Sequence, residues 1–565
     1  PTAMARTKIF TEGRWRNAPV YDRNALKPGQ SVKGPALIIE AHNTTVVEDG
    51  WGAELTPRRH LVLTRVRAAK KRTAIGTTAD PVMLEVFNNL FMSIAEQMGV
   101  TLENTAYSVN IKERLDFSCA LFDADGQLIA NAPHMPVHLG SMDRSVETVI
   151  ANNPKMAPGD VYVLNAPYNG GTHLPDITVV TPVFDDKNKK ILFYTASRGH
   201  HADVGGIAPG SMTPRATNIN EEGVVIDNFK MLDKGTLRER ALFDLLSSGP
   251  YPCRNPAQNI ADLKAQVAAN EKGVQELKKM IAQFGLPVVK AYMQHVQDNA
   301  EESVRRVLDV LHDSEFAYEM DQGCTIRVAI TVDKKARAAK VDFTGTSAQQ
   351  ASNFNAPRPV TRAATLYVFR VMVGHNIPMN AGCMKPIELI IPDDCMLAPK
   401  YPAAVVAGNV EVSQAVTDTL LGALGAMAAC QGTMNNFNFG NDTYQYYETI
   451  CGGAGAGNGF NGTSAVHTHM TNTRLTDPEI LEYRYPVRLE SFEVRRGSGG
   501  KGRWHGGDGT TRTIVFNEQM DVSLLTGHRR IPPFGLNGGE PGECGQNWKR
   551  HKNGTMEHLE HTAQT

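Results

Sequence analysis

Four side chains with metal-binding chemistry stand in three short polar segments of the chain. Asp116 lies in the first segment, and His173 and Asp176 lie three residues apart in the second. In the third, His200 is followed directly by His201. Imidazole nitrogens and carboxylate oxygens are the ligands of catalytic divalent ions with open positions, and such an ion makes hydroxide available near neutral pH. The sequence therefore predicts a hydrolytic metal site. The competing interpretation is that His173 and Asp176 only hydrogen-bond the loop backbone.

Two other histidine pairs are alternative ligand sets. His134 and His138 are four residues apart, but nearby prolines interrupt any helix that would align them. His467 and His469 are two residues apart, and such residues share one face of an extended chain. Either pair could instead line the same cleft and bind substrate.

Strand-like sequence frames the second and third polar segments. Apolar runs that are typical of strands occupy residues 160–164, 177–183 and 191–196. His173, Asp176 and His200 fall just outside the ends of these runs, where a rigid scaffold can hold ligands at the edge of a cleft.

Helical patterns supply the rest of the expected scaffold. Asp80 as N-cap and Pro81 at the first helical position predict a helix that Gly99 can close. Apolar residues at helical spacing predict two long helices within 255–315 and further helices near 360–374 and 411–429. Alternating apolar residues around 326–332 and 339–343 indicate a hairpin, and 387–391 an apolar strand.

Length and alternation of elements indicate a multi-domain α+β protein, because 565 residues exceed a single core. The expected body mixes helices and strands between a small β-rich N-terminal domain and a Gly-rich, β-rich C-terminal part. We expect a β-rich segment at 1–68, a linker at 69–78 with Lys70, Lys71 and Arg72, a metal-bearing region at 79–250, a helical scaffold at 251–320, an α/β region at 321–440 and a Gly-rich, β-rich region at 441–565.

Composition narrows the class of protein. The chain has 58 basic and 59 acidic residues, which argues against binding of nucleic acid or membrane surfaces by bulk charge. Eight scattered cysteines without a Cys-x-x-Cys pair are typical of reduced thiols in a cytoplasmic protein. No signal peptide or membrane-spanning run is visible. We therefore expect a cytoplasmic protein.

Motifs for other chemistries are weak or missing. Residues 457–462 match G-x-G-x-x-G, but no helical pattern follows, so they predict a tight loop with close backbone approach. The basic, glycine-rich tract at 495–503 is predicted to be an ordered turn region. No P-loop and no Gly-x-Ser-x-Gly elbow occurs, so a nucleotide site is expected elsewhere and a serine hydrolase has little support.

The polar segments resemble a known family. Similarity to the hydantoinase B and ATP-dependent 5-oxoprolinase family lies in residues 113–123, 171–176, 197–206, 342–347, 380–383, 467–474 and 495–500, and extends over 76–545. Residues 1–68 resemble the C-terminal end of the partner family, hydantoinase A. Only the C-terminal end of the A-type half is present, and the C-terminal residues of this chain lack the glycine-rich last segment that is usual in the family. We therefore expect a piece of a longer enzyme.

The resemblance implies a reaction and a division of labour. It implies opening of the lactam 5-oxo-L-proline to L-glutamate, coupled to ATP hydrolysis in an actin-like A-type half. That half, in the same precursor chain or a separate subunit, would bind ATP and Mg²⁺, which this chain would not. The B-type half is expected to hold one divalent ion (Zn²⁺, Mn²⁺ or Fe²⁺) on Asp116, His173, Asp176 and His200.

Three more residues receive roles as hypotheses. His201 is the candidate proton carrier, and Arg198 or Arg474 the candidate clamp for the substrate carboxylate. The expected partners are the A-type half, a small lactam and further copies of the chain in a homo-oligomer, with no nucleic acid and no membrane. The competing functions are an ATP-dependent hydantoinase, another lactamase or a ketone carboxylase subunit, and, from another class, a non-catalytic scaffold for the ATPase half.

Overall fold

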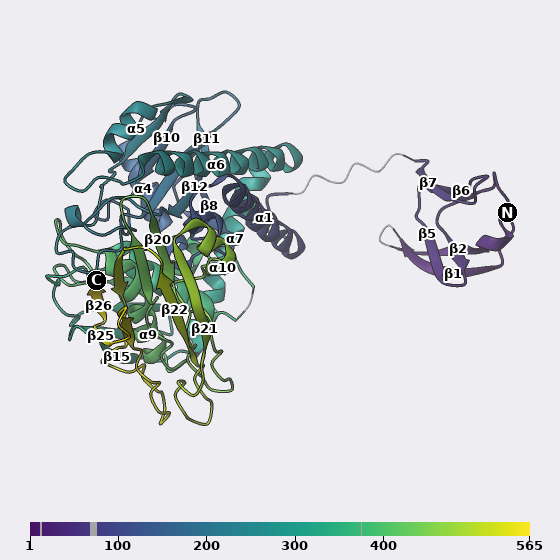
Figure 1. Cartoon of the computed structure of the whole chain (residues 1–565). Helices are drawn as coiled ribbons and strands as arrows, with labels where there is room; N and C mark the ends of the chain where they lie inside the picture. The colour runs from purple at the N-terminus through teal and green to yellow at the C-terminus, as the bar shows by residue number, and fades with distance from the viewer. Residues whose placement is uncertain (12–13, 68–75, 375) are drawn as a thin grey trace. The chain divides into compact units, whose positions relative to one another are not determined.

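The computed structural model describes residues 1–11, 14–67, 76–374 and 376–565 (Figure 1). Contacts divide the chain into two compact units, Pro1–Gly76 and Thr77–Thr565. Most of the predicted linker, including Lys70, Lys71 and Arg72, lies outside the described residues. Within the described ranges, no helix combines the length and apolar character that crossing a membrane requires.

The first unit consists of two small sheets. One has the strand order β1-β2-β4-β5 and the other β3-β6-β7. The strands are β1 (Ala5–Thr11), β2 (Arg14–Asp22), β3 (Ser31–Lys33), β4 (Ala36–Glu40), β5 (Asn43–Val47), β6 (Trp51–Leu55) and β7 (Leu61–Arg65), with the short helix η1 (Arg23–Ala25) after β2. Apolar residues from both sheets, such as Val32, Ile38 and Leu55, form its core. The β-rich N-terminal domain is as predicted.

A seven-stranded sheet dominates the first part of the second unit. Its strand order is β14-β13-β10-β11-β12-β8-β9, and all its neighbours pair antiparallel. The strands are β8 (Phe117–Asp123), β9 (Leu128–Asn131), β10 (Val161–Leu164), β11 (Asp176–Phe184), β12 (Ile191–His200), β13 (Phe229–Asp233) and β14 (Thr236–Leu237). The central strands β11, β12 and β8 follow one another directly, so their ends meet at one edge.

Helices cover both faces of this sheet. On one face, α6 (Pro256–Phe284) lies over β11 and β12, and its Gln266 amide donates to the carbonyls of Ile177 and Ser197. On the other face, α4 (Met142–Asn152) packs apolar side chains against the sheet. The other helices of this region are α1 (Pro81–Thr105), α2 (Val109–Lys112), α3 (Pro136–Leu139), η2 (Ile219–Glu221), α5 (Glu239–Leu246) and α7 (Leu286–Val310).

A second sheet and the helices beside it form a large apolar core. The sheet has the order β15-β16-β17-β18. Its strands are β15 (Ser314–Glu319), β16 (Thr325–Asp333), β17 (Ala338–Asp342) and β18 (Ile387–Ile390), and the helices are α8 (Arg358–Met372), η3 (Ala381–Met384), η4 (Gly408–Val412, a π-helix) and α9 (Ser413–Ala423). The predicted hairpin is present as β16 and β17.

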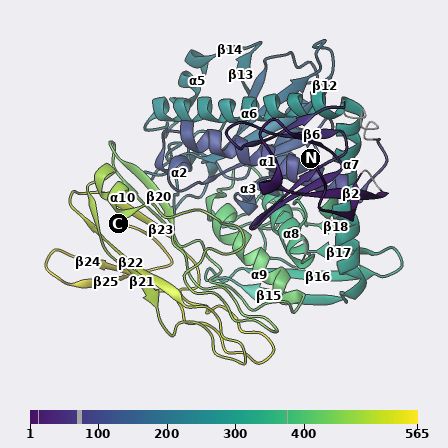
Figure 2. The ribbon, with the colours of Figure 1, turned by 90° about the vertical axis from the view of Figure 1, so that its right-hand side faces the viewer.

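The C-terminal part is rich in strands and glycine. Its elements are β19 (Asn436–Gly440), β20 (Gln445–Thr449), α10 (Pro478–Arg484), β21 (Val487–Arg495), β22 (Gly509–Phe516), β23 (Asp521–Leu525), β24 (Asn547–Arg550), β25 (Met556–Leu559) and β26 (Thr562–Gln564). Two glycine-rich loops touch here: a Cβ on Gly453 would lie 1.9 Å from the carbonyl oxygen of Gly507. Figure 2 shows β21, β22, β24 and β25 gathered away from α6.

The α+β prediction is confirmed, with differences at element ends. The first helix does not stop at Gly99 but continues to Thr105. A Cβ at Gly99 would lie 2.6 Å from the His134 ring, so this glycine permits close packing and does not end the helix. The helix expected at 411–429 ends at Ala423, shortly before Gly425, whose φ of 61° suits a helix terminus.

Candidate metal centre

Strand register brings three of the predicted ligands to one edge of the seven-stranded sheet. Asp176 is the first residue of β11 and pairs directly with His200, the last residue of β12. The next strand, β8, begins at Phe117, and the backbone N–H of His200 donates to the carbonyl of Asp116 at 2.9 Å. The antiparallel ladder thus brings together residues that lie far apart in the sequence.

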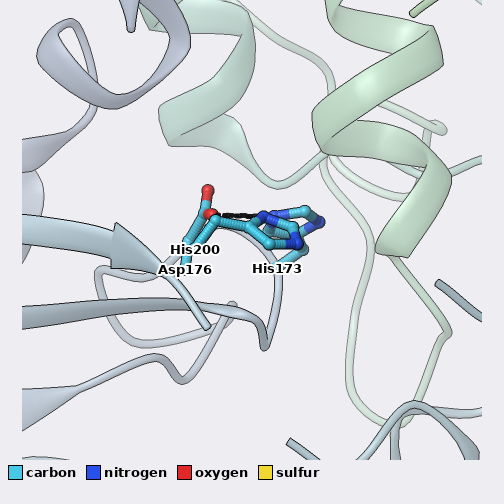
Figure 3. Close-up of side chains that lie close together, drawn as sticks. All are labelled: His173, Asp176 and His200. Atoms are coloured by element: carbon cyan, nitrogen blue, oxygen red, sulfur yellow. Dashed lines mark hydrogen bonds and ion pairs between the residues drawn. The ribbon is translucent and has the colours of Figure 1, made fainter. Parts of the chain in front are cut away.

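His173, Asp176 and His200 form the centre of the site (Figure 3). One donor atom from each lies within 4.8 Å of the other two. His173 Nε2 and His200 Nδ1 each lie 3.0 Å from Asp176 Oδ1. Asp116 lies at the margin of this cluster, with its Oδ2 4.0 Å from His200 Nδ1. All four side chains are buried.

The second oxygen of Asp176 has its own partners. His138 Nε2 lies 3.1 Å from Asp176 Oδ2, and the Asn409 amide donates to the same oxygen at 2.9 Å. His138 is on α3, and Asn409 is on the π-helix η4, a type of irregularity that is frequent at functional sites. These two side chains fix the orientation of the carboxylate from two distant parts of the chain.

Electrostatics keep Asp176 ionised in a buried setting. Burial alone would raise the pKa of Asp176, but the charges of and hydrogen bonds from His138 and His173 outweigh it and hold that pKa well below its usual value. Burial lowers the pKa of His200, although Asp116 and Asp176 oppose the shift. Asp176 is therefore ionised and His200 neutral, the protonation states that a metal ion requires of these two side chains.

The imidazole nitrogens of His173 and His200 indicate whether these residues suit a metal ion. Nδ1 of His173 and Nε2 of His200 are buried and have no hydrogen-bond partner among the residues that the structure describes. An orphaned buried polar atom is costly and rare in a folded protein. A divalent ion would accept these lone pairs, so the donor set fits such an ion.

The two adjacent histidines face opposite sides of the sheet. His201 Nε2 donates to Gln266 Oε1 at 3.0 Å, and its Nδ1 accepts from the Asn259 amide at 3.2 Å. Both partners are on α6. Successive residues of an extended chain point to opposite faces, so His200 faces Asp176 while His201 contacts the helix. The proton-carrying role of His201 stays a prediction.

The two arginines differ in exposure. Arg198 is fully buried, and its guanidinium donates to the hydroxyls of Thr178, Ser141 and Ser145. These contacts tie β12 to β11 and to the start of α4. Arg474 is exposed, and its backbone N–H donates to the carbonyl of Arg114. The carboxylate-binding role stays a prediction for both, and only Arg474 offers an accessible side chain.

The alternative histidine pairs lie in different places. His134 packs edge-on against Phe117 and its Nδ1 accepts from the Cys119 backbone, whereas His138 contacts Asp176. His469 belongs to a separate buried cluster with Asp418 and Cys430. Sequence reasoning named His138 only as a rival ligand, and it missed Asn409, which no local pattern connects to the site.

Tyr447 is a further neighbour that the sequence did not reveal. Its ring stacks on the His200 ring, with centroids 4.6 Å apart, and the Arg114 guanidinium lies over its ring. Arg114 also donates to the Tyr447 carbonyl and lies 3.7 Å from Asp116 Oδ2. The C-terminal strand β20 thereby closes one side of the centre.

Comparison with known proteins agrees with this architecture. A model of the hydantoinase B/oxoprolinase family matches residues 80–565, and one of the hydantoinase/oxoprolinase C-terminal domain matches residues 2–66. Both resemblances predicted from the sequence are confirmed. The crystal structure of an ATP-dependent caprolactamase from Pseudomonas jessenii shares the fold, with a TM-score of 0.75 at 24% identity over 86% of this chain and 88% of that chain.

The curated relatives named 5-oxoprolinase are much longer than this chain. 5-Oxoprolinase 1 of Arabidopsis thaliana is 46% identical over 97% of this chain but only 45% of its own length. The 5-oxoprolinase of Dictyostelium discoideum is 45% identical over 95% of this chain and 43% of its own length. The chain thus spans less than half of each of these relatives. With matching family models over almost its whole length, the chain belongs to the hydantoinase B/oxoprolinase family, preceded by a hydantoinase/oxoprolinase C-terminal domain.

Proposed function

We propose that this chain is the hydrolytic, B-type part of an ATP-dependent 5-oxoprolinase. It would open the lactam of 5-oxo-L-proline to L-glutamate, with ATP and Mg²⁺ bound by an A-type half in the same precursor or in a separate subunit. The observation that carries the proposal is the buried cluster of His173, Asp176 and His200, whose free imidazole nitrogens suit one divalent ion. The relatives named 5-oxoprolinase supply the substrate class.

The residues of the chain would hold the ion and the substrate. A divalent ion on His173, Asp176 and His200, with Asp116 beside them, would polarise the lactam carbonyl and lower the pKa of bound water. His138 and Asn409 would keep the carboxylate of Asp176 in place. Tyr447 would exclude bulk water from the His200 side. Arg474, the exposed arginine, would bind the substrate carboxylate, and His201 remains the candidate proton carrier.

Activity of the joined halves tests the proposal. The chain is combined with an A-type half, and glutamate released from 5-oxo-L-proline is measured with and without ATP. We expect ATP-dependent release that His173→Ala abolishes together with one equivalent of bound metal. His312→Ala, at an exposed histidine, is the matched control and should retain both.

Two outcomes would contradict parts of the proposal. Turnover of hydantoins alone would replace the substrate while keeping the metal centre. Full turnover by a correctly folded His173→Ala variant that has lost this equivalent of metal would favour a non-catalytic scaffold for the ATPase half.

A further inference from the structure

A second buried cluster of metal-binding side chains lies within the larger unit. Donor atoms of Asp418, Cys430 and His469 all lie within 4.8 Å of one another, and all three residues are buried. Asp418 is on α9, Cys430 follows that helix, and His469 lies in the segment before α10. Three separate parts of the chain therefore converge on one point.

The contacts of this cluster leave donor capacity unused. His469 Nε2 lies 3.1 Å from Asp418 Oδ1, and the backbone N–H of Cys430 donates to the same oxygen at 3.2 Å. Asp418 Oδ2 is buried and has no hydrogen-bond partner within the described part of the chain. The Gly455 N–H donates to Cys430 Sγ at 3.2 Å, a contact that stabilises a thiolate. The carboxylate oxygen, the thiol and the imidazole together form a set of donors that could bind one metal ion.

The geometry differs from that of a nucleophilic cysteine. In a catalytic triad, the carboxylate and the nucleophile occupy opposite nitrogens of the imidazole. Here the carboxylate of Asp418 faces Nε2, while the Tyr367 hydroxyl lies 3.5 Å from Nδ1. Because Nδ1 faces Tyr367, the arrangement instead matches a metal-binding histidine whose other ring nitrogen is oriented by a partner outside the metal site.

We propose that Asp418, Cys430 and His469 form a second metal site for a thiophilic divalent ion of the Zn²⁺ class. Thiolate, imidazole and carboxylate are all zinc ligands, and thiolate selects such ions over Mg²⁺, Ca²⁺ and Mn²⁺. Binding would release to solvent the thiol proton of Cys430 and any proton on the His469 ring, and would leave a neutral centre of one thiolate, one carboxylate, one neutral imidazole and one divalent ion. Cys430 lines a cavity of about 1910 Å³, which supplies an entry path.

This site is distinct from the first centre. Asn409, which contacts Asp176, and Asp418 belong to the continuous run of η4 and α9. The nine residue steps from Asn409 to Asp418 correspond to roughly 13 Å along the axis at the helical rise of about 1.5 Å per residue. Bridged two-metal sites hold their ions about 3.5–4 Å apart. The two ions would therefore bind independently.

Cobalt substitution tests the second site selectively, because a thiolate ligand gives Co²⁺ a near-ultraviolet charge-transfer band. The first centre has only nitrogen and oxygen donors, so it cannot produce this band. The full chain is freed of metal, titrated with CoCl2 and followed by absorption, and bound metal is counted after dialysis against ZnCl2. We expect the charge-transfer band and two bound equivalents of Zn²⁺. No band in the titrated wild-type chain would overturn the proposal.

Variants assign the band to Cys430. Cys430→Ser should lose the band and one equivalent of Zn²⁺, and Asp418→Asn should weaken Co²⁺ binding at least tenfold. Cys451→Ser is the matched control, because Cys451 is also buried beside the cavity but is outside the cluster. A band that survives in Cys430→Ser overturns the proposal.

Alkylation of the wild-type chain does not depend on how a variant folds. Bound ZnCl2 should slow iodoacetamide modification of Cys430 at least tenfold while leaving Cys451 unchanged. Equal modification of Cys430 with and without ZnCl2 would overturn the proposal.

Discussion

His138 contacts the opposite carboxylate oxygen of Asp176 from the one that faces His173 and His200. Its Nε2 lies 3.1 Å from Oδ2, and its Nδ1 lies 3.3 Å from the Ser118 hydroxyl. The ring is therefore held from both sides, and it in turn fixes the carboxylate. Partners of this kind orient metal ligands without binding the metal.

Removing this partner should weaken the metal centre without emptying it. We expect His138→Ala to lower the affinity of the first site for a divalent ion by about 10–100-fold, the usual effect of losing a ligand's outer partner. Isothermal titration with ZnCl2 measures the affinity, and Cys430→Ser in the background removes the thiolate ligand proposed for the second site. His138→Gln, which can still donate to Asp176, should recover part of the loss. Unchanged affinity in His138→Ala would show that Asp176 needs no such support.

His201 allows a test of proton transfer against structural support. Both ring nitrogens are engaged by Gln266 and Asn259, and burial lowers the pKa of His201. We expect His201→Ala to lower the melting temperature by several degrees, since it leaves two buried partners unpaired, a loss of about 1–3 kcal/mol each.

The pH dependence of kcat distinguishes proton transfer by His201 from structural support by the same residue. A structural role predicts that kcat of the folded variant keeps its dependence on pH. Loss of one limb of the pH profile of kcat, with thermal stability retained, would instead assign proton transfer to this ring.

The convergence of the predicted ligands could be inferred because the sequence carries local signals for the strand ends that hold them. Polar residues at the ends of apolar runs indicated strand ends. In the structure the two strands extend beyond those runs to Asp176 and His200, which pair with each other. The Asn409 contact could not be predicted, because it spans 233 residues and depends on a π-helix that has no sequence pattern.

The prolines correctly predicted that no helix aligns His134 with His138, but they did not reveal the short helix that holds His138. Pro133 and Pro136 argued against a helix that would align His134 and His138. In the structure Pro136 is the first residue of the short helix α3, a position that proline favours because its missing N–H is not needed there. His138 therefore turns toward Asp176 from a helix that begins after His134. Periodicity alone did not reveal this start.

Arg474 provides a test of substrate binding. Its side chain is exposed, whereas that of Arg198 is buried among hydroxyls. We expect Arg474→Lys to raise KM for 5-oxo-L-proline roughly tenfold with a smaller change in kcat, because lysine cannot form the paired hydrogen bonds of guanidinium to a carboxylate. Steady-state kinetics of the joined halves measure both constants. Arg503→Lys, at another exposed arginine, is the control. An unchanged KM in Arg474→Lys would remove this residue from the substrate site.

Glu222 makes the stability of the folded chain depend on pH. The carboxylate is fully buried, and its Oε1 accepts hydrogen bonds from the N–H groups of Val405 and Val406. Its Oε2 has no hydrogen-bond partner in the described ranges of the chain. Burial raises the pKa of Glu222 from 4.5 to about 8, against the opposing effect of these N–H groups. Between these two values the folded state keeps a proton that the unfolded state releases. Stability from this group is therefore fully present below about pH 4.5 and is lost as the pH rises toward 8.

Glu222→Gln should remove this loss, because glutamine keeps the accepting oxygen and never ionises. We expect the variant and the wild type to melt at similar temperatures at pH 5, and the variant to be more stable at pH 8 by on the order of a few kcal/mol. Melting temperatures measured at several pH values check the trend. Glu388→Gln, at an exposed carboxylate on β18, should leave the pH trend unchanged. A constant difference between Glu222→Gln and wild type across this range would mean that Glu222 keeps its ordinary pKa in the folded chain. In that case its two backbone hydrogen bonds, which hold the segment leading into η4 and Asn409, would outweigh the cost of burying the charge.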